Sequence, residues 1–404
     1  MNMHLNPSRL KRSKLLSFAL LILMTVLALE GISYVGERYL VSKGIIYEPP
    51  KLEEDAYRLK PDLQLGWPSP ESFGKGDYDS SGSRIIPSFP DPNEEACVSA
   101  YGDSFTWGHE VGNEFAWSNV LSKILDCRVS NFGVSGYGTD QSYLRFKHND
   151  RDMAKIVILG HLAENVVRNV NQFRHLLYPA KGYGMKPRFV IAPNGSLELI
   201  PVPHLSLDKY RTMVRNPEKF LRHEYWSPGG RTGISKAGFP YTVSLLKALN
   251  NYRLQARFAG KLFWADFYRN DHPSRALEIT TLIIKAFYRD AHLTGRSPVV
   301  VIFPWTFDLT DYQKNKIWVY QPLLDNLRAS GIDALNIGDG ILNYLGQRNP
   351  CDLFTSCHGG HFNQEGNAIV AKLIAEYLTR KNVSASERNS ALSALALMTE
   401  RKTY

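Results

Sequence analysis

Ser104 and a few other polar residues stand where a chain could carry out nucleophilic catalysis. Ser104 follows a short apolar run, in the tripeptide Gly-Asp-Ser, and a serine hydroxyl becomes a nucleophile when a base removes its proton. A second apolar run leads into Gly133, Gly136 and Gly138, whose backbone N–H groups are open to a ligand. A third is followed by Asn165, whose amide is a suitable donor to an oxyanion. Each has an ordinary explanation as a turn or a helix cap, but together they supply a nucleophile and oxyanion donors.

Two histidines near the C-terminus offer the base that such a serine needs. His358 and His361 stand three residues apart in His-Gly-Gly-His. They could be metal ligands, a base with a neighbour, or loop residues without chemistry. With Cys351 and Cys357 they form a set of soft and imidazole ligands, but the spacing is not a familiar zinc pattern, so we expect no metal. His109 lies either at a pocket rim or in a surface loop.

The elements that must position these residues alternate between strand and helix. Short apolar runs predict buried strands, and amphipathic runs between them predict helices, which together favour a parallel sheet with helices on both faces. Ligands bind such sheets at the carboxyl ends of the strands, where Ser104 and Asn165 lie. The first strands are expected over Ala96–Gly102, Cys127–Gly133 and Lys155–Gly160, and the helices over Phe115–Leu125 and Thr139–Asn149.

The alternation stops between residues 170 and 295 and then resumes. In the interruption, Asn194–Gly195 predicts a β-hairpin with a type I′ turn. Helices are expected near Tyr241–Phe258 and Ser274–Thr294. The later elements are strands over Pro298–Trp305 and Asp333–Gly338, and helices over Gln321–Ala329 and Gln364–Arg380, the last capped by Asn363. The fold class is therefore a three-layer α/β/α, flavodoxin-like domain of about five parallel strands with an inserted segment.

The chain has 404 residues, 44% of them hydrophobic, as in a globular protein with a substantial core. Its net charge of +9 comes partly from the two ends and shows no long basic run, so we expect no nucleic-acid partner. Residues 15–35 are almost wholly apolar and can just span a bilayer as one transmembrane helix. The basic flank Arg9–Lys14 places the rest of the chain outside the cytoplasm. A cleaved signal peptide is the competing interpretation.

The four cysteines are compatible with disulfides in an exported domain. Sequence alone permits three pairings. Cys97 and Cys127 stand at the starts of two strands that would be neighbours, and Cys351 and Cys357 would close one short loop. We therefore expect the pairs Cys97–Cys127 and Cys351–Cys357.

The order of these motifs resembles the SGNH (GDSL-like) hydrolase superfamily. Its first block is matched by "GDSFTWG" (Gly102–Gly108), its second by "NFGVSGYGTDQ" (Asn131–Gln141), its third more loosely by "GHLAEN" (Gly160–Asn165), and its fifth by "HGGH" (His358–His361). "LGW" and "DSSGSR" upstream also resemble the lead-in of membrane-anchored members. The resemblance covers Ala96–Asn165 and Pro298–Arg380 and says little about the segment between them.

The resemblance implies a role for each matching residue. Ser104 is the nucleophile, and His361 is the general base. The oxyanion hole consists of the Ser104 N–H, the Gly136 N–H and the Asn165 side chain. Such enzymes hydrolyse esters or transfer acyl groups through an acyl-enzyme and need no cofactor.

The chain departs from the family at the acid that orients the histidine. The family places this acid three residues before the histidine, where this chain has His358. Such an acid can be worth about 10⁴ in rate. Asp352 could take its place if the Cys351–Cys357 loop folds it back, a backbone carbonyl could orient His361 in a Ser–His dyad, or the site could be weak or inactive. Asp103 is a poor candidate, because it neighbours the nucleophile and braces the turn.

The expected function is a serine esterase that removes acetyl or other acyl groups from a carbohydrate or lipid, anchored in the cytoplasmic (inner) membrane with its catalytic domain periplasmic or extracellular. The alternatives are an O-acyltransferase acting on an envelope or secreted polysaccharide, and a non-catalytic glycan-binding protein with a degraded triad. The expected layout is a basic start (1–14), an anchor (15–35), a lead-in (36–95), the catalytic domain (96–382, insertion 170–295) and a flexible tail (383–404).

Overall fold

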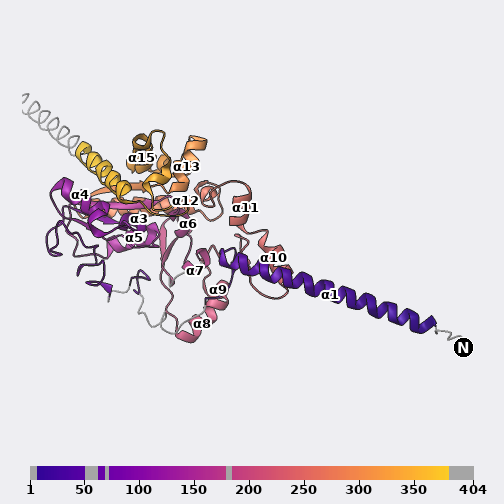
Figure 1. Ribbon diagram of the computed structural model, residues 1–404. Coiled ribbons are helices and arrows are strands. Elements are labelled where there is room, and N and C mark those ends of the chain that lie inside the picture. The colour runs from indigo at the N-terminus through magenta and orange to yellow at the C-terminus, as the bar shows by residue number, and fades with distance from the viewer. Residues whose placement is uncertain (1–6, 51–61, 69–71, 179–183, 382–404) are drawn as a thin grey trace, which may run out of the picture. The chain divides into compact units, whose positions relative to one another are not determined.

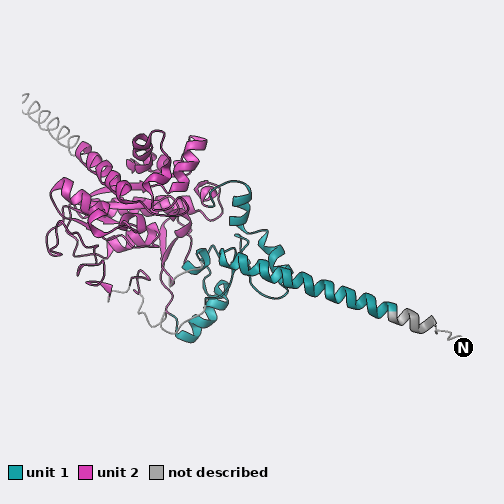
Figure 2. Cartoon of the chain, in the orientation of Figure 1, with its two compact units in different colours: residues 1–56, 173–182, 205–263 teal, residues 57–172, 183–204, 264–404 magenta. Residues whose placement is uncertain are grey.

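The computed structural model describes residues 7–50, 62–68, 72–178 and 184–381, with side chains from Lys14 onward. The expected tail (383–404) and residues 1–6 of the basic start lie outside the described residues. The chain divides into two compact units (Figure 2). The first comprises residues 1–56, 173–182 and 205–263, and the second comprises residues 57–172, 183–204 and 264–404.

The second unit is built on a five-stranded sheet, and every pairing in it is parallel. The strand order is β3-β2-β4-β8-β9. Their side chains are mostly buried, which is typical of a sheet covered on both faces. The predicted five-stranded parallel sheet is thus confirmed. The strands are β2 (Val98–Tyr101), β3 (Val129–Asn131), β4 (Ile156–Leu162), β8 (Ser297–Phe303) and β9 (Ala334–Asn336).

Helices cover both faces of this sheet (Figure 1). On one face α12 (Ala276–Leu293) packs against α5 (Thr139–Lys147) and α14 (Gln321–Ala329). The other face carries α4 (Trp117–Leu125), α15 (Ile337–Leu345) and the helix over residues 364–381, which α4 meets where the Trp117 N–H donates to Asn367. Right-handed crossovers between parallel strands produce this division. The shorter helices of the unit are α3 (Ser104–Trp107), α6 (Asn165–Arg168), α13 (Thr306–Asn315), η2 (Asn113–Phe115), η3 (Ala265–Tyr268) and η4 (Pro350–Leu353).

The predicted hairpin is present as β5 (Arg188–Ile191) and β6 (Leu197–Ile200), but its turn is not type I′. A type I′ turn needs positive φ at both central residues, and here Gly195 has φ 83° while Asn194 is not among the described non-glycine residues with positive φ. The Gly195 N–H donates to the Ala192 carbonyl at 2.8 Å. Pro193 therefore occupies the second position of the turn, where its fixed φ suits a type I geometry.

The first unit is built around the long helix α1 (Pro7–Ser42). Two short parallel strands, β1 (Ile46–Tyr47) and β7 (Ser235–Lys236), pair within it. The helical stretch expected near Tyr241–Phe258 is divided into two helices, because the Asn251 side chain accepts the Arg253 N–H and so caps the second one. The helices after α1 are α7 (Arg174–Leu177), α8 (Leu207–Arg215), α9 (Pro217–Phe220), α10 (Tyr241–Ala248) and α11 (Tyr252–Phe258).

Candidate active site

The candidate residues gather at the carboxyl end of the sheet. Strand β2 lies between β3 and β4, so the chain places the next strand, β3, on one side of β2 and the later strands on the other side. In open parallel sheets the crevice at such a switch point is where ligands bind. Ser104 begins α3 after β2, and Asn165 begins α6 after β4.

Ser104 stands at the start of α3, held by the residue before it. The Asp103 carboxylate caps the helix by accepting the Phe105 N–H at 2.9 Å. Its other oxygen pairs with the Arg168 guanidinium at 3.1 Å, and Arg168 also pairs with Glu164 at 2.6 Å. Burial raises the pKa of Asp103, and Arg168 opposes this shift. Asp103 thus braces the turn that presents Ser104.

Close packing explains one glycine in each of the first three motifs. A Cβ on Gly102 would meet the Thr106 hydroxyl at 1.8 Å, and one on Gly160 would meet the same atom at 2.1 Å. A Cβ on Gly133 would lie 2.5 Å from the Trp107 nitrogen. These distances are too short for a side chain at any of the three positions, so the glycines let the loop that carries Ser104 pack against the end of β3 and against β4.

The histidine predicted as the base lies against the serine. The His361 Nε2 is 2.8 Å from the Ser104 Oγ. The two residues are 257 positions apart in the chain, so only the fold brings them together. Because the hydroxyl is the donor in the resting state of such a pair, Nε2 accepts and Nδ1 carries the ring proton.

The acid that faces His361 is Glu110, a residue that the sequence interpretation did not identify. One Glu110 oxygen lies 3.1 Å from the His361 Nδ1. The other accepts the His361 backbone N–H at 3.0 Å and the hydroxyl of Thr355. The ring contact is an ion-pair distance and not a hydrogen bond of normal geometry, because the buried Nδ1 has no hydrogen-bond partner among the described residues. The carboxylate nevertheless fixes both the ring and the backbone of the histidine.

Glu110 reaches this position because its loop turns back on itself. Its φ of 69° lies in the left-handed region, which is uncommon for a residue with a side chain and is found where the surroundings impose it. The buried Arg84 imposes it here. Its guanidinium donates to the carbonyls of Trp107, Gly108 and Val111 at 2.6–2.7 Å, and so holds the loop from both sides of Glu110.

The charges of the pair suit a base and its orienting acid. Burial lowers the pKa of His361 to about 4, although Glu110 opposes this shift. Burial alone would raise the pKa of Glu110, but the hydrogen bonds from Thr355 and His361 outweigh it and lower the pKa to about 2. At neutral pH His361 is therefore an unprotonated imidazole beside a carboxylate, the state that accepts a proton from Ser104.

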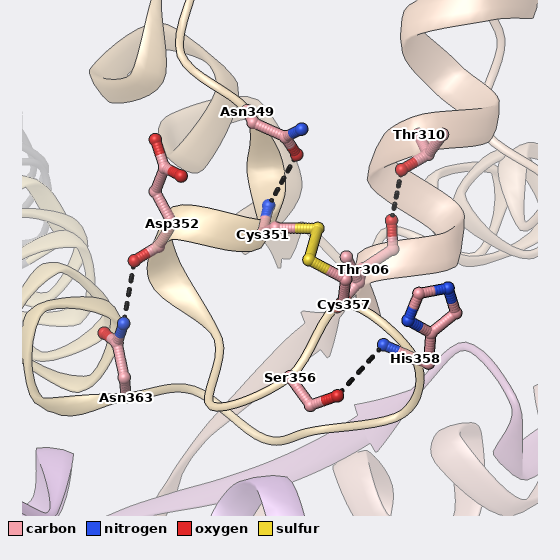
Figure 3. Close-up of a disulfide and its surroundings, with 9 residues drawn as sticks. All are labelled: Thr306, Thr310, Asn349, Cys351, Asp352, Ser356, Cys357, His358 and Asn363. Atoms are coloured by element: carbon pink, nitrogen blue, oxygen red, sulfur yellow. Dashed lines mark hydrogen bonds between the residues drawn. A yellow bond between two sulfur atoms is a disulfide. The ribbon is translucent and has the colours of Figure 1, made fainter.

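Asp352, the tentative acid, does not contact His361. It lies in η4 with an exposed side chain, and its backbone carbonyl accepts the Asn363 amide at 2.7 Å (Figure 3). In Figure 3 its carboxylate and the exposed His358 stand on opposite sides of the Cys351–Cys357 disulfide. The disulfide closes the loop as expected, but the 3₁₀ turn directs Asp352 outward. What the loop brings to the site instead is Thr355.

The other disulfide also forms as expected. Cys97 and Cys127 are bonded, with their Cα atoms 6.0 Å apart. The pairing follows from the sheet, because Val98 and Val129 are register partners on β2 and β3.

Of the three glycines expected to offer N–H groups to a ligand, two are used within the protein. The Gly133 N–H donates to the Asn131 side chain at 3.0 Å, and the Gly138 N–H donates to the Gln141 side chain at 3.2 Å. Gly136, with φ 83°, remains as a candidate donor. Gly136 is the glycine to which the family resemblance gives an oxyanion role, and that role stays a prediction.

The Asn165 side chain is a candidate donor to an oxyanion because its polar atoms are not used within the described part of the protein. It is fully buried, and neither its amide nitrogen nor its amide oxygen has a hydrogen-bond partner among the described residues. A buried polar group without a partner costs about 1–3 kcal/mol. Such groups are rare in folded proteins and call for an explanation, and oxyanion binding is one.

Aromatic side chains surround the serine–histidine pair. The Phe105 ring lies 4.9 Å from the His361 ring, and the exposed His109 lies 5.0 Å from it, so His109 belongs to the rim of the site. The half-buried Trp305, after β8, donates its indole N–H to the Gly360 carbonyl at 2.9 Å. In the described residues no group of three or more His, Cys, Asp or Glu side chains is placed to hold a metal ion.

No protein-family model and no curated protein matches this chain. The solved structures that match it include a member of the lipolytic protein G-D-S-L family from Veillonella parvula DSM 2008 and an alpha/beta hydrolase enzyme from the metagenome of Lake Arreo, Spain. The first is 12% identical, with a TM-score of 0.32 over 70% of this chain and 98% of that chain. The second is 12% identical, with a TM-score of 0.36 over 69% of this chain and 93% of that chain. These identities and TM-scores are too low to assign a role to any residue, so the assignment of the site depends on the distances and contacts described above.

Proposed function

We propose that this protein is a serine ester hydrolase of the SGNH type that works through an acyl-enzyme. The observation that carries the proposal is the position of His361, with Ser104 on one ring nitrogen at 2.8 Å and Glu110 on the other at 3.1 Å. A nucleophile, a base and an orienting acid in this order are the parts of a catalytic triad, which is recognised by geometry and not by sequence position. Glu110 also supplies the acid whose absence motivated the non-catalytic alternative.

The proposed reaction has two halves. His361 takes the proton of Ser104 as its oxygen attacks the ester carbonyl, and the resulting oxyanion is stabilised by the Ser104 N–H, the Gly136 N–H and the Asn165 amide. His361 then gives the proton to the leaving alcohol, which departs and leaves an acyl-serine. In the second half His361 activates a water molecule that releases the acid and regenerates Ser104.

The proposed substrate is an acylated carbohydrate, with acetyl as the acyl group. The half-buried indole of Trp305, which donates its N–H to the Gly360 carbonyl, supports this choice, because aromatic rings with a polar edge suit the mixed polar and C–H surface of a sugar. The proposed location is outside the cytoplasmic membrane. The apolar helix after a basic start and the two disulfides support it.

The test is turnover of p-nitrophenyl acetate by the full-length protein in detergent. We expect Ser104→Ala to abolish turnover and Ser356→Ala, a change of an exposed serine in the disulfide loop, to leave it unchanged. A fluorophosphonate probe should label Ser104 alone. Turnover that survives Ser104→Ala would contradict the proposal. Adding a glycan then tests the acyl acceptor, because a sugar hydroxyl that replaces water would yield an acylated glycan.

A further inference from the structure

The apolar helix α1 contains an acidic residue at a depth where a charge is costly. Residues Lys14–Ser42 are long and apolar enough to cross a membrane. The almost wholly apolar run before the first charge, Leu15–Leu29, covers only about 22 Å at 1.5 Å per residue, whereas the hydrocarbon core is about 30 Å thick. A crossing helix therefore needs residues beyond Glu30. This places Glu30 within the outer boundary of the hydrocarbon.

Glu30 is not left without partners there. Its carboxylate accepts the backbone N–H of Tyr241 at 2.6 Å and that of Thr242 at 3.4 Å, at the start of α10. A carboxylate at a helix N-terminus satisfies N–H groups that have no partner within the helix and interacts favourably with the helix dipole. The charge on α1 is thus matched by the end of another helix, and α10 must begin at the depth of Glu30.

Two further polar residues of α1 continue this contact. The Ser33 hydroxyl lies 2.9 Å from the Thr242 hydroxyl, and the Glu37 carboxylate accepts the Gly238 N–H at 3.1 Å. Positions 30, 33 and 37 lie on one face of a helix. On the same side, a Cβ at Gly36 would lie 3.2 Å from the Leu245 side chain, so the two helices approach closely. The outer half of α1 therefore presents a polar, small-residue face to α10.

Helix α10 buries its small side chains and exposes its large apolar ones, which is the reverse of a helix on the surface of a water-soluble protein. Its buried residues are small, Ser244 and Ala248. Apart from Lys247, its exposed residues are large and apolar: Val243 is 42% exposed and Leu246 60%. The flanking Phe239 and Leu249 are 75% and 55% exposed. A surface helix normally buries its apolar side and exposes its polar side. A contiguous exposed apolar patch beside a membrane-crossing helix calls for an apolar environment.

We propose that α10 and the segment before it lie in the outer leaflet of the membrane that α1 crosses, with Phe239, Val243, Leu246 and Leu249 in contact with lipid acyl chains. Lys247 is exposed next to this surface and reaches the headgroups with its amine, while its stem stays among the chains. The protein is then attached by a crossing helix and a second, shallower helix. Glu30, Ser33 and Glu37 belong to the folded unit, which disfavours removal of α1 as a leader.

The test is depth-dependent quenching in the full-length protein reconstituted into phosphatidylcholine vesicles. The described cysteines are all in disulfides, so a new cysteine under non-reducing conditions takes the only label. An NBD fluorophore is placed at Leu246→Cys, at Val243→Cys as a second site, and at Asp208→Cys as a control in the exposed first turn of α8. We expect doxyl-labelled lipid to quench the label at positions 246 and 243 and aqueous iodide to quench it at 208.

Equal iodide quenching at all three positions would overturn the proposal. A second result would also overturn it: labels that are protected from both quenchers, but lose this protection in vesicles that hold at most one chain each. That result would mean that a second copy of the protein, and not lipid, covers the apolar surface. Substitutions of Glu30 provide an independent test of the contact between α1 and α10. Glu30→Gln keeps an acceptor for the Tyr241 N–H and should retain lipid quenching at position 246, whereas Glu30→Leu should reduce it. Neither measurement depends on esterase activity.

Discussion

Replacing Glu110 with glutamine tests the assignment of the catalytic acid. The change keeps the shape of the side chain but removes its charge. If the amide oxygen still accepts from Thr355 and the His361 N–H, the N–H₂ group faces the His361 Nδ1 and opposes the tautomer that carries its proton there. The imidazolium that forms as Ser104 attacks then loses its counter-charge. We expect a lower kcat, with KM little changed, because the interaction strengthens as the transition state forms.

The size of the effect follows from the geometry. Two unit charges 3.1 Å apart attract by about 1.3 kcal/mol in bulk water and by about 5 kcal/mol at an effective dielectric constant of about 20. Each 1.36 kcal/mol is a factor of ten in rate, so the limits are about 10-fold and several-thousand-fold. The Glu110 side chain is 37% exposed and that of His361 is 16% exposed, which places the pair between these limits. We expect a loss of about 100-fold.

The assay is p-nitrophenyl acetate hydrolysis with Asp352→Asn as the matched control. Both changes neutralise one carboxylate within reach of the His361 segment, but only Glu110 contacts the ring. Asp352→Asn should retain the wild-type kcat. A loss with Asp352→Asn equal to that with Glu110→Gln, or full activity in Glu110→Gln, would refute the reasoning.

Three further outcomes are expected. Asn165→Ala should lower kcat about 10²–10³-fold while leaving the melting temperature unchanged or higher, because the amide has no partner to lose among the described residues; a fall in stability would indicate a structural role. The pH profile of kcat/KM should lose activity as pH falls through about 4, where His361 gains its proton, and a limb near 6.5 would contradict the lowered pKa. Replacing Cys97 and Cys127 with serine should reduce the free energy of unfolding by about 3.5 kcal/mol for a separation of 30 residues, measured by denaturant titration, with kcat unchanged.

Much of the fold could be predicted because its signals are local. Each buried strand is a short apolar run, each crossover helix is amphipathic, and the disulfide at the strand starts follows from strand adjacency. Ser104 and Asn165 could be located for the same reason, since each follows directly after a strand. The sequence also indicated the hairpin, although Pro193 and not the Asn-Gly pair determines its turn.

The acid could not be predicted, because its position depends on contacts between distant parts of the chain. Glu110 and His361 are 251 residues apart, and Glu110 stands in a loop whose course depends on Arg84. The family pattern directed attention to the residues just before His361. The available signal was a carboxylate six residues after the nucleophile, in "SFTWGHE", where the chain must turn back. A positive φ at Glu110 has no signature in its residue type.

The contacts of Arg84 also define where an active fragment can begin. A truncation at residue 96 would retain all five strands, the serine and the histidine, yet it would remove the guanidinium that holds the carbonyls on both sides of Glu110. It would also remove Asp79, which lies in the same upstream segment. The buried Arg128 would then lose the carboxylate that now lies 2.6 Å from its guanidinium. Fragments for expression, and any domain transplanted into another protein, therefore need at least the residues from Asp79 onward. A fragment that begins at residue 96 would lack the contacts that hold the loop of Glu110 against the sheet.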